Sequence, residues 1–334
     1  MQSFEWVDAT SVEEAASMLA ARGPGGPVVA KAGGIDLVDL LKEGIVRPSR
    51  VVNLKSIAGL DRIAVDDTGA LTLGALVTLA RIEAAPEVLR RFPALADAAR
   101  HAATPQVRNA ATIGGNLLQR PRCWYFRSAL FHREGADPAA AAREGENQYH
   151  AIFDNARSAM VHASTPATAL VAHGAEVVLT ADTGRSRSVP VKDFLLPPDA
   201  ARDRDADIRP NEVLTAVRVP APPAGTRAAY HKQTERDSYD WPICDVAVIL
   251  ATAGDSVRDA TIVLGWVAPT PRRAFESERI LHGKRVTEGI AREAARAAVA
   301  DATPLAKNAY KVPVLETVVR RTILAAAGMP AGAG

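Results

Sequence analysis

The sequence contains only two cysteines, Cys123 and Cys244, and they lie far apart in the chain. A disulfide framework and a structural zinc site built from thiolates are therefore excluded. The chain has no stretch of about 18 apolar residues, which argues against insertion into a membrane. The segment Met1–Trp6 has neither the basic nor the apolar region of an export signal. A net charge of +2, with both signs scattered along the chain, gives no support to a nucleic-acid partner.

Several familiar signatures of cofactor sites and catalytic sites are also missing. The sequence has no G-x-G-x-x-G and no G-x-x-x-x-G-K-[ST] motif, so it indicates neither a Rossmann site nor a P-loop. Its seven histidines show no H-E-x-x-H pairing, and no G-x-S-x-G segment occurs. We therefore assign no catalytic metal and no acid–base catalyst to this chain.

Two diglycine segments, Lys31–Leu37 and Thr112–Leu117, lie about 80 residues apart. Before the first, Pro27–Ala30 is typical of a short buried strand, and after it Asp36–Lys42 places leucines at helical spacing. Paired glycines let backbone N–H groups approach an anion, and a helix N-terminus strengthens such a site. Taken alone, either segment is also compatible with an ordinary tight turn. Together they predict one bound nucleotide cofactor.

The pattern A-G-G-x-D-L followed by T-I-G-G-N-L, with Gln106–Asn109 before the second motif, closely resembles the FAD-binding medium subunit of the molybdenum hydroxylases. This family includes xanthine dehydrogenase, aerobic carbon monoxide dehydrogenase and the three-subunit bacterial aldehyde oxidoreductases, of which the last branch is the most similar. The resemblance continues through Ser164–Leu170, Tyr230–Lys232 and Asn308–Pro313, and so covers nearly the whole chain.

The resemblance implies FAD as the cofactor, with main-chain amides of both glycine pairs facing its diphosphate. Thr112 and Asn116 would add side-chain hydrogen bonds. Lys232 matches a basic position near the flavin ring, although an ordinary surface lysine is the alternative interpretation. The cofactor-binding residues implied in this way are Lys31, Ala32, Gly33, Gly34, Ile35, Asp36, Leu37, Thr112, Gly114, Gly115, Asn116, Ser164, Thr165 and Lys232.

The chain departs from the family pattern at two of these positions. Many relatives have threonine where Ile35 stands, so one hydroxyl contact is expected to be missing. Many have an acidic residue where Thr165 stands, which removes the carboxylate that would serve the adenosine end of the cofactor. The hydroxyls of Ser164 and Thr165 are the candidates to replace it.

The segment 119–160 matches an insertion that carries a [4Fe–4S] cluster in the aldehyde oxidoreductase branch. Such a cluster needs four thiolates, and this segment has only Cys123. His132 and Asp137 would be unusual substitute ligands. We therefore expect that the segment remains as a scaffold without the cluster, and that Cys123 is a small buried side chain.

Aromatic residues make up only 5% of the sequence, and two groups of them lie near the motifs. Trp124, Tyr125 and Phe126 follow the second glycine motif, and Tyr239 and Trp241 follow Lys232. Either group is suited to stacking on the flavin ring, and either is equally suited to filling a hydrophobic core.

The expected fold class is α+β. A two-subdomain FAD-binding domain of the PCMH type would span 1–222, with subdomains of about 1–55 and 56–222, and a C-terminal sheet-plus-helices domain of the CO dehydrogenase flavoprotein type would span 223–330. Local patterns predict a solvated loop over 193–211 and a boundary at 220–225. They predict helices at 12–21, 36–42, 78–101, 287–301 and 313–327, hairpins joining 62–65 to 70–74 and 175–180 to 187–191, and strands at 28–30, 50–54, 247–253 and 259–267.

The predicted function is that of an oxidoreductase subunit that transfers electrons. The resemblance implies a large molybdopterin-binding partner that oxidises an aldehyde or N-heterocycle, and a small [2Fe–2S] partner that passes electrons to FAD in this chain. A stand-alone FAD oxidase of the same fold and a flavin-free structural subunit are the alternatives. We expect a cytoplasmic protein, with export to the periplasm on a partner's signal as the other route.

Overall fold

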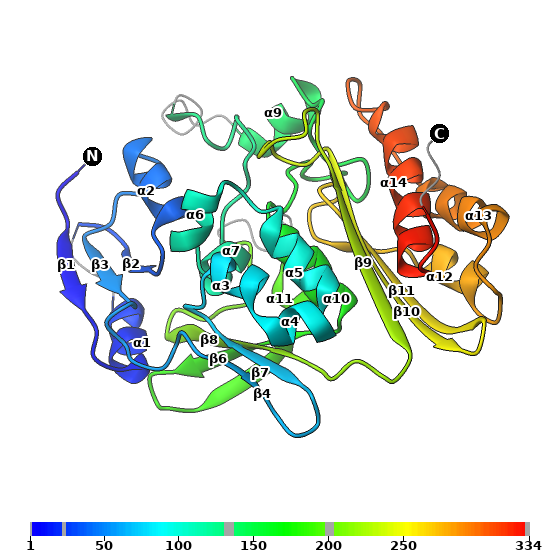
Figure 1. The fold of residues 1–334 in the computed structure, drawn as a ribbon. Helices are drawn as coiled ribbons and strands as arrows, with labels where there is room; N and C mark the ends of the chain where they lie inside the picture. Colours follow the sequence, from blue (N-terminus) through cyan, green and yellow to red (C-terminus); the bar gives the residue numbers. More distant parts are fainter. Residues whose placement is uncertain (1, 22–24, 130–136, 198–203, 331–334) are drawn as a thin grey trace.

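The computed structural model describes residues 2–21, 25–129, 137–197 and 204–330. Its strands form three separate sheets, which follow one another along the sequence and lie from left to right in Figure 1. Each sheet carries helices, so the predicted α+β class is confirmed. Within the described residues, no helix combines the length and the apolar character that crossing a bilayer requires.

The first sheet is small and parallel, with strand order β1-β3-β2. Its elements are β1 (Glu5–Asp8), α1 (Val12–Ala20), β2 (Val28–Lys31), α2 (Ile35–Lys42) and β3 (Arg50–Asn53). The predicted helices and strands of this region are therefore confirmed. Ser11 begins α1 because its hydroxyl oxygen accepts a hydrogen bond from the amide of Glu14 at 3.1 Å. The small side chains of Ala15 and Ala16 are fully buried where α1 contacts the second sheet.

The second sheet is antiparallel and has the order β4-β5-β8-β6-β7. Its strands are β4 (Ile63–Val65), β5 (Leu71–Gly74), β6 (Glu176–Ala181), β7 (Ser186–Pro190) and β8 (Glu212–Val219). The two predicted hairpins are both present. The sequence analysis assigned no element to 212–219, yet β8 is the central strand that joins the two hairpins into one sheet. Alternate side chains of β8, including Val217 and Val219, are fully buried.

Short helices pack on this second sheet and supply most of the core beside it. They are α3 (Leu79–Ala84), α4 (Pro86–Arg91), α5 (Pro93–Arg100), α6 (Pro105–Ala110), α7 (Ile113–Leu117), α10 (Thr165–Ala172) and α11 (Val191–Phe194), and α9 (Pro138–Glu144) lies in the insertion. A proline occupies the first turn of each of α4, α5 and α6. Proline is favoured at this position, where its missing N–H costs no helix hydrogen bond. The prediction of a wholly solvated loop over 193–211 is wrong at Phe194, Leu195 and Ala206, whose side chains are buried in this core.

The third sheet has the order β12-β11-β10-β9 and is antiparallel. Its elements are β9 (Thr226–Gln233), β10 (Cys244–Ala253), β11 (Ser256–Gly265), β12 (Arg272–Arg273), α12 (Phe275–Leu281), α13 (Glu288–Val299) and α14 (Lys311–Ala326). The predicted strands and helices of this region are confirmed, whereas β9, β12 and α12 were not predicted. The end of β8 at Val219 and the start of β9 at Thr226 are compatible with the predicted boundary at 220–225.

The third sheet is buried on both faces. Val246 and Val248 on β10 pack in the same core as α12, α13 and α14, and Ala247 between them packs with the helices of the second unit. On that second face, the buried carboxylate of Asp245 accepts hydrogen bonds from Thr168 on α10 at 3.0 Å and from Tyr230 on β9 at 2.6 Å. This buried polar group connects the second and third units.

Burial raises the pKa of the Asp245 carboxyl to about 7, against the lowering effect of the hydrogen bonds from Tyr230 and Thr168 and of the nearby Lys232 cation. The folded protein therefore holds this proton up to a higher pH than the unfolded chain does, and the contribution of Asp245 to stability falls as the pH rises from about 4 to about 7. At 1.36 kcal/mol per pKa unit, this loss amounts to about 4 kcal/mol.

The Asp245→Asn variant cannot ionise at this position. Its free energy of unfolding should therefore not show the decrease with rising pH that Asp245 causes. We predict that the difference in melting temperature between the variant and the unmodified protein increases in favour of the variant from pH 5 to pH 8. Thermal melts across this range measure it, and Asp193→Asn, at an exposed ion pair with Lys192, is the control. Parallel pH profiles for all three proteins would contradict the prediction.

Candidate functional site

The two glycine segments meet at one cavity of about 380 Å³. The cavity lies where the first unit, with β2 and α2, faces α6 and α7 of the second unit, and its lining extends to β9. Of the predicted site residues, those that line it are Lys31, Ala32, Gly33, Gly34, Ile35, Asp36, Leu37, Thr112, Gly114, Gly115, Asn116, Thr165 and Lys232. Ser164 does not line the cavity, and its role is described below.

The first glycine segment presents free backbone donors. Gly34 precedes α2 and has a φ of +83°, a left-handed conformation that glycine adopts without strain. The amides of Ile35, Asp36 and Leu37 form the first turn of α2 and have no acceptor within the part of the chain that the structure describes. Such amides carry the partial positive charge of a helix N-terminus, so this turn is suited to an anionic group.

Gly33 allows the two units to approach each other closely. A Cβ atom at Gly33 would lie 2.1 Å from the carbonyl oxygen of Ala110, at the end of α6. At Gly115, an added Cβ would lie 4.0 Å from the Cβ of Ala32, so the two glycine segments are in van der Waals reach of each other. The absence of side chains therefore brings the two segments to opposite sides of one cavity.

The second segment contributes differently from the prediction. The amide of Gly114 donates to the carbonyl of Ala75 at 2.9 Å, and the amide of Gly115 donates to the hydroxyl of Thr112 at 3.2 Å. The expectation that these two amides face the diphosphate is therefore wrong, because the chain itself occupies them. At the glycines of this segment, which lack side chains, a ligand can come close to the backbone. The side-chain amide of Asn116 is a further group that can contact it.

Ser164 and Thr165 also have structural partners. The Ser164 hydroxyl donates to Oδ1 of Asn116 at 2.5 Å and accepts from the amide of Ala167, which begins α10. The Thr165 hydroxyl donates to the carbonyl of Ala98 at 3.0 Å. Both hydroxyl protons are thus engaged within the chain, while the oxygen of Thr165, which lines the cavity, can still accept a hydrogen bond in place of the carboxylate. Ser164 instead fixes the carbonyl side of Asn116 and leaves its NH₂ group for the cavity.

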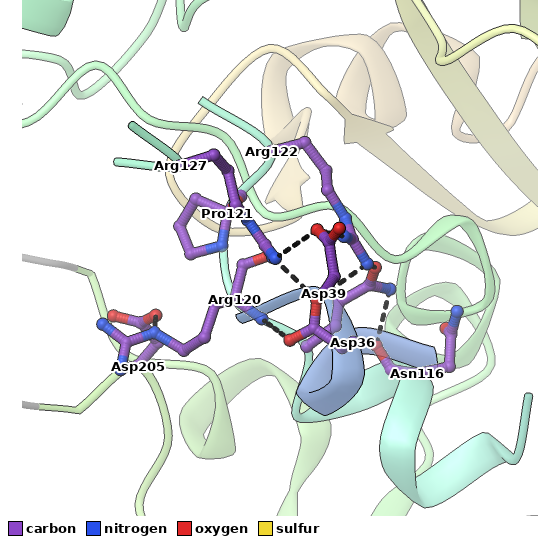
Figure 2. Close-up of polar contacts among 9 residues, drawn as sticks. Asp36, Asp39, Asn116, Arg120, Pro121, Arg122, Arg127 and Asp205 are labelled. Carbon is purple, nitrogen blue, oxygen red and sulfur yellow. Dashed lines mark hydrogen bonds and ion pairs between the residues drawn. The ribbon is translucent and has the colours of Figure 1, made fainter. Parts of the chain in front are cut away.

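Asp36 is a tether between α2 and the start of the insertion. Figure 2 shows that its carboxylate lies among Arg120, Arg122 and Arg127. It forms ion pairs with the guanidinium groups of Arg122 at 2.9 Å and Arg127 at 2.7 Å, and it accepts from the amide of Arg120 at 3.0 Å. Asp39, one turn later on α2, pairs with Arg127 at 3.0 Å. The sequence analysis did not single out these arginines, because only the fold brings 120–127 to α2.

Cations outnumber carboxylates in the cavity lining, which has Lys31, Arg120, Arg122 and Lys232 against Asp36 and Glu212. Arg120 pairs with Asp205 at 2.6 Å and Arg122 with Asp36 at 2.9 Å, so the two lysines are the cations most available to a ligand. Burial lowers the pKa of the Lys31 ammonium, and the neighbouring Lys55 lowers it further. The Lys31 ammonium also lies 5.2 Å from the ring centre of Trp6, which helps to fix it.

Lys232 is half-buried at the cavity and is not an ordinary surface lysine. Its ammonium donates to the carbonyl of His101 at 2.8 Å. Burial lowers its pKa, while the nearby carboxylates of Asp245 and Asp240 raise it. Lys232 can therefore place a cation at the end of the cavity that is walled by β9.

Cys123 is buried, as expected, and packs with Ala142 and Met160. Its sulfur lies 3.1 Å from Nε2 of His150, and burial raises the pKa of its thiol. Asp137, which was considered as a substitute ligand, caps α9 by accepting from the amide of Ala139. His132 lies outside the described residues. Apolar side chains and the His150 ring thus pack around the one cysteine of the insertion, and the absence of a cluster stays a prediction.

A helix turn with free amides, two glycine segments that line one cavity, and the cations of Lys31 and Lys232 suit a protein that holds an anionic cofactor between two units. Comparison with known proteins specifies the cofactor. Residues 2–222 match the family model for the FAD binding domain in molybdopterin dehydrogenase, and residues 229–326 match the CO dehydrogenase flavoprotein C-terminal domain. The chain belongs to the FAD-binding medium subunits of the molybdenum hydroxylase family.

The similarity to individual relatives extends over nearly the whole chain. The aldehyde oxidoreductase FAD-binding subunit PaoB of Escherichia coli K12 is 32% identical over 93% of this chain and 94% of its own. The carbon monoxide dehydrogenase medium chain of Hydrogenophaga pseudoflava is 29% identical over 97% and 96%. A solved structure of carbon monoxide dehydrogenase from that organism superposes with a TM-score of 0.77, at 28% identity and 98% coverage of both chains. The predictions of the family, of FAD and of an oxidoreductase flavoprotein component are thereby confirmed.

The close contact at Gly33 generates a prediction. We expect Gly33→Ala to push the first unit away from Ala110, at a cost of about 1–3 kcal/mol, and to lower the flavin content of the purified protein severalfold. The measurement is the ratio of flavin absorbance to protein absorbance, together with a thermal melt. Gly289→Ala is the control, because an added Cβ there meets only the Thr287 hydroxyl at 4.0 Å. Full flavin content in Gly33→Ala would show that the close approach is not needed.

Proposed function

We propose that this chain is the flavin subunit of a three-subunit molybdenum hydroxylase that oxidises an aldehyde. In this complex a large subunit with a molybdopterin cofactor would act on the aldehyde, and a small subunit with [2Fe–2S] clusters would pass the electrons to this chain. The 32% identity to the aldehyde oxidoreductase FAD-binding subunit PaoB over 93% of this chain supports the aldehyde class. The cytoplasm remains the predicted compartment.

The observation that carries the proposal is the single cavity that both glycine segments line. Bound FAD would take up electrons one at a time and release them singly or in pairs, which suits a relay from one-electron iron–sulfur clusters to an external acceptor. The residues of this chain bind and orient the cofactor. The first turn of α2 supplies amides for the diphosphate, and Asn116 supplies a side-chain donor on the opposite side.

The remaining task of the chain is to adjust the affinity of the cofactor for electrons. Lys232 would supply a positive charge near the flavin ring, which stabilises the more negative reduced form. The described residues that line the cavity include no residue to which we assign a role as an acid or base towards an organic substrate. The chain alone is therefore expected to leave an aldehyde unchanged.

Anaerobic reduction tests this function directly. The purified three-subunit complex should contain stoichiometric FAD, and its flavin absorption should bleach when an aldehyde is added. The isolated chain, loaded with FAD, should not bleach with aldehyde but should bleach with dithionite. Bleaching of the isolated chain by aldehyde would indicate a stand-alone oxidase, and a folded complex without flavin would indicate a structural subunit.

Lys232 provides a second prediction. We expect Lys232→Met to keep its flavin but to shift the midpoint potential of the bound flavin to a more negative value, by about 30 mV for each ~1.4 kcal/mol of lost stabilisation. Spectroelectrochemical titration measures the shift. Lys192→Met is the matched control, because Lys192 is exposed and pairs only with its neighbour Asp193 among the described residues. An unchanged potential in Lys232→Met would remove Lys232 from the flavin environment.

A further inference from the structure

The first turn of α2 carries a negative charge at the place where the diphosphate of FAD is proposed to bind. Its free amides belong to Ile35, Asp36 and Leu37, and all three residues line the FAD cavity. The carboxylate of Asp36 lies in the same turn, and Asp39 follows one turn later. A carboxylate repels the phosphates that the amides attract. The affinity of this turn for an anion therefore depends on how the two carboxylates are neutralised.

Two arginines of the insertion neutralise them (Figure 2). Arg127 donates to Asp36 at 2.7 Å and to Asp39 at 3.0 Å. Arg122 pairs with Asp36 at 2.9 Å and lies 3.7 Å from the carboxylate of Asp39. The guanidinium group of arginine is always charged in proteins. Two positive and two negative groups are thus balanced, and the four side chains together carry no net charge.

Water contributes little to this balance. The side chains of Arg122 and Arg127 are 15% and 12% exposed, and that of Asp36 is 16% exposed. Charges that are partly withdrawn from water interact more strongly than charges on the surface, and salt screens them less. The loss of one guanidinium group would therefore leave an uncompensated negative charge next to the free amides of α2.

Arg127 acts on the cavity only through other residues. It does not belong to the described residues that line the FAD cavity. Its Nε donates to the carbonyl of Pro121 at 2.8 Å, and its Nη2 donates to the carbonyl of Arg120 at 3.0 Å as well as to Asp36. These bonds direct the guanidinium group to α2 and away from a ligand. An effect of Arg127 on FAD binding would thus pass through the two carboxylates.

Arg122 has a wider structural role. It donates to Oε1 of Gln119 at 3.0 Å, and Gln119 donates to the carbonyl of Asn116 in α7 at 2.8 Å. Its guanidinium group also lies 5.1 Å from the ring centre of Trp241, in the segment that follows β9. Because Arg122 lines the FAD cavity and links all three units, its removal would disturb the cavity itself. Arg127 is therefore the better residue for a test of charge.

We propose that Arg122 and Arg127 of the insertion raise the affinity of the chain for FAD by neutralising Asp36 and Asp39 on α2. In this role Arg127 is a positioning residue that acts through the carboxylates, and the ligand chemistry that it favours is a diphosphate. The inference rests on the proposed place of the diphosphate at the first turn of α2. It does not depend on the oxidation of an aldehyde.

Titration of the flavin-free full-length chain with FAD, followed by flavin fluorescence, tests the proposal. Arg127→Met leaves one carboxylate unbalanced and should weaken FAD binding about tenfold. Arg127→Lys keeps the charge and should retain most of the affinity. Asp36→Asn/Arg127→Met leaves Asp39 balanced by Arg122, so the double variant should bind FAD about as tightly as the unmodified chain.

A matched control exists on α13. Glu288, in the first turn of that helix, pairs with Arg292 at 3.1 Å and with Arg320 at 2.8 Å. Arg320 is 16% exposed, close to the value for Arg127, but none of these three residues lines the FAD cavity. Arg320→Met should therefore leave the affinity for FAD unchanged. Thermal melts of the flavin-free proteins report whether each variant keeps its fold.

Equal FAD affinity in Arg127→Met and the unmodified chain would overturn the proposal. A double variant, or an Arg127→Lys variant, that binds as weakly as Arg127→Met would also overturn it, because the loss would then come from a broken tether and not from charge. If Arg127→Met does not fold, Asp36→Asn alone decides. It should bind FAD at least as tightly as the unmodified chain, and weaker binding would overturn the proposal. A complex whose flavin does not bleach with aldehyde would reject the proposed function and leave these affinities as expected.

Discussion

The site depends on the close contact of backbone at Gly33 with the end of α6. A Cβ there would lie 2.1 Å from the Ala110 carbonyl oxygen, a distance that no side chain can accept. The first unit therefore docks with its parallel sheet and α2 against the second unit, and the cavity remains between them. In this arrangement the residues that carry the free amides of α2 line the cavity. A local property, the missing side chain of one residue, thus determines how two units are placed.

The insertion 119–160 has a structural purpose that does not require a metal cluster. Its first residues bind α2 through Asp36, and its last residues pack against the third unit, where Asn308 donates to the carbonyls of His150 and Ala151. It therefore links the first unit to the third across the side of the FAD cavity. None of these contacts involves a sulfur atom, so they do not depend on cysteine ligands. The segment can therefore keep this conformation with Cys123 as its single cysteine.

The sequence was most informative where a structure is determined locally. The Ser11 cap and the two hairpins depend on neighbours in the chain, and the predictions there were confirmed. It was least informative where the partners are distant. The central strand β8 pairs with β5 and β6, which precede it by more than thirty residues, and the arginines around Asp36 lie over eighty residues from it. The occupied amide of Gly114 is a further case, because its acceptor is the carbonyl of Ala75, in a distant part of the chain.

The register of the third sheet explains how Lys232 comes to the FAD cavity. Side chains of β9 alternate between its two faces, so Tyr230 and Lys232 lie on the same face, which is directed to the second unit. Tyr230 is fixed there by Asp245, and Asp245 is itself the residue opposite Lys232 in the neighbouring strand. The buried Tyr230–Asp245–Thr168 contact that joins the units is thus also what sets the position of the cation. A shift of β9 by one residue would direct Lys232 into the core of the third unit and His231 to the cavity. The placement of a cation at the cavity is in this way a consequence of strand pairing in a different unit of the fold.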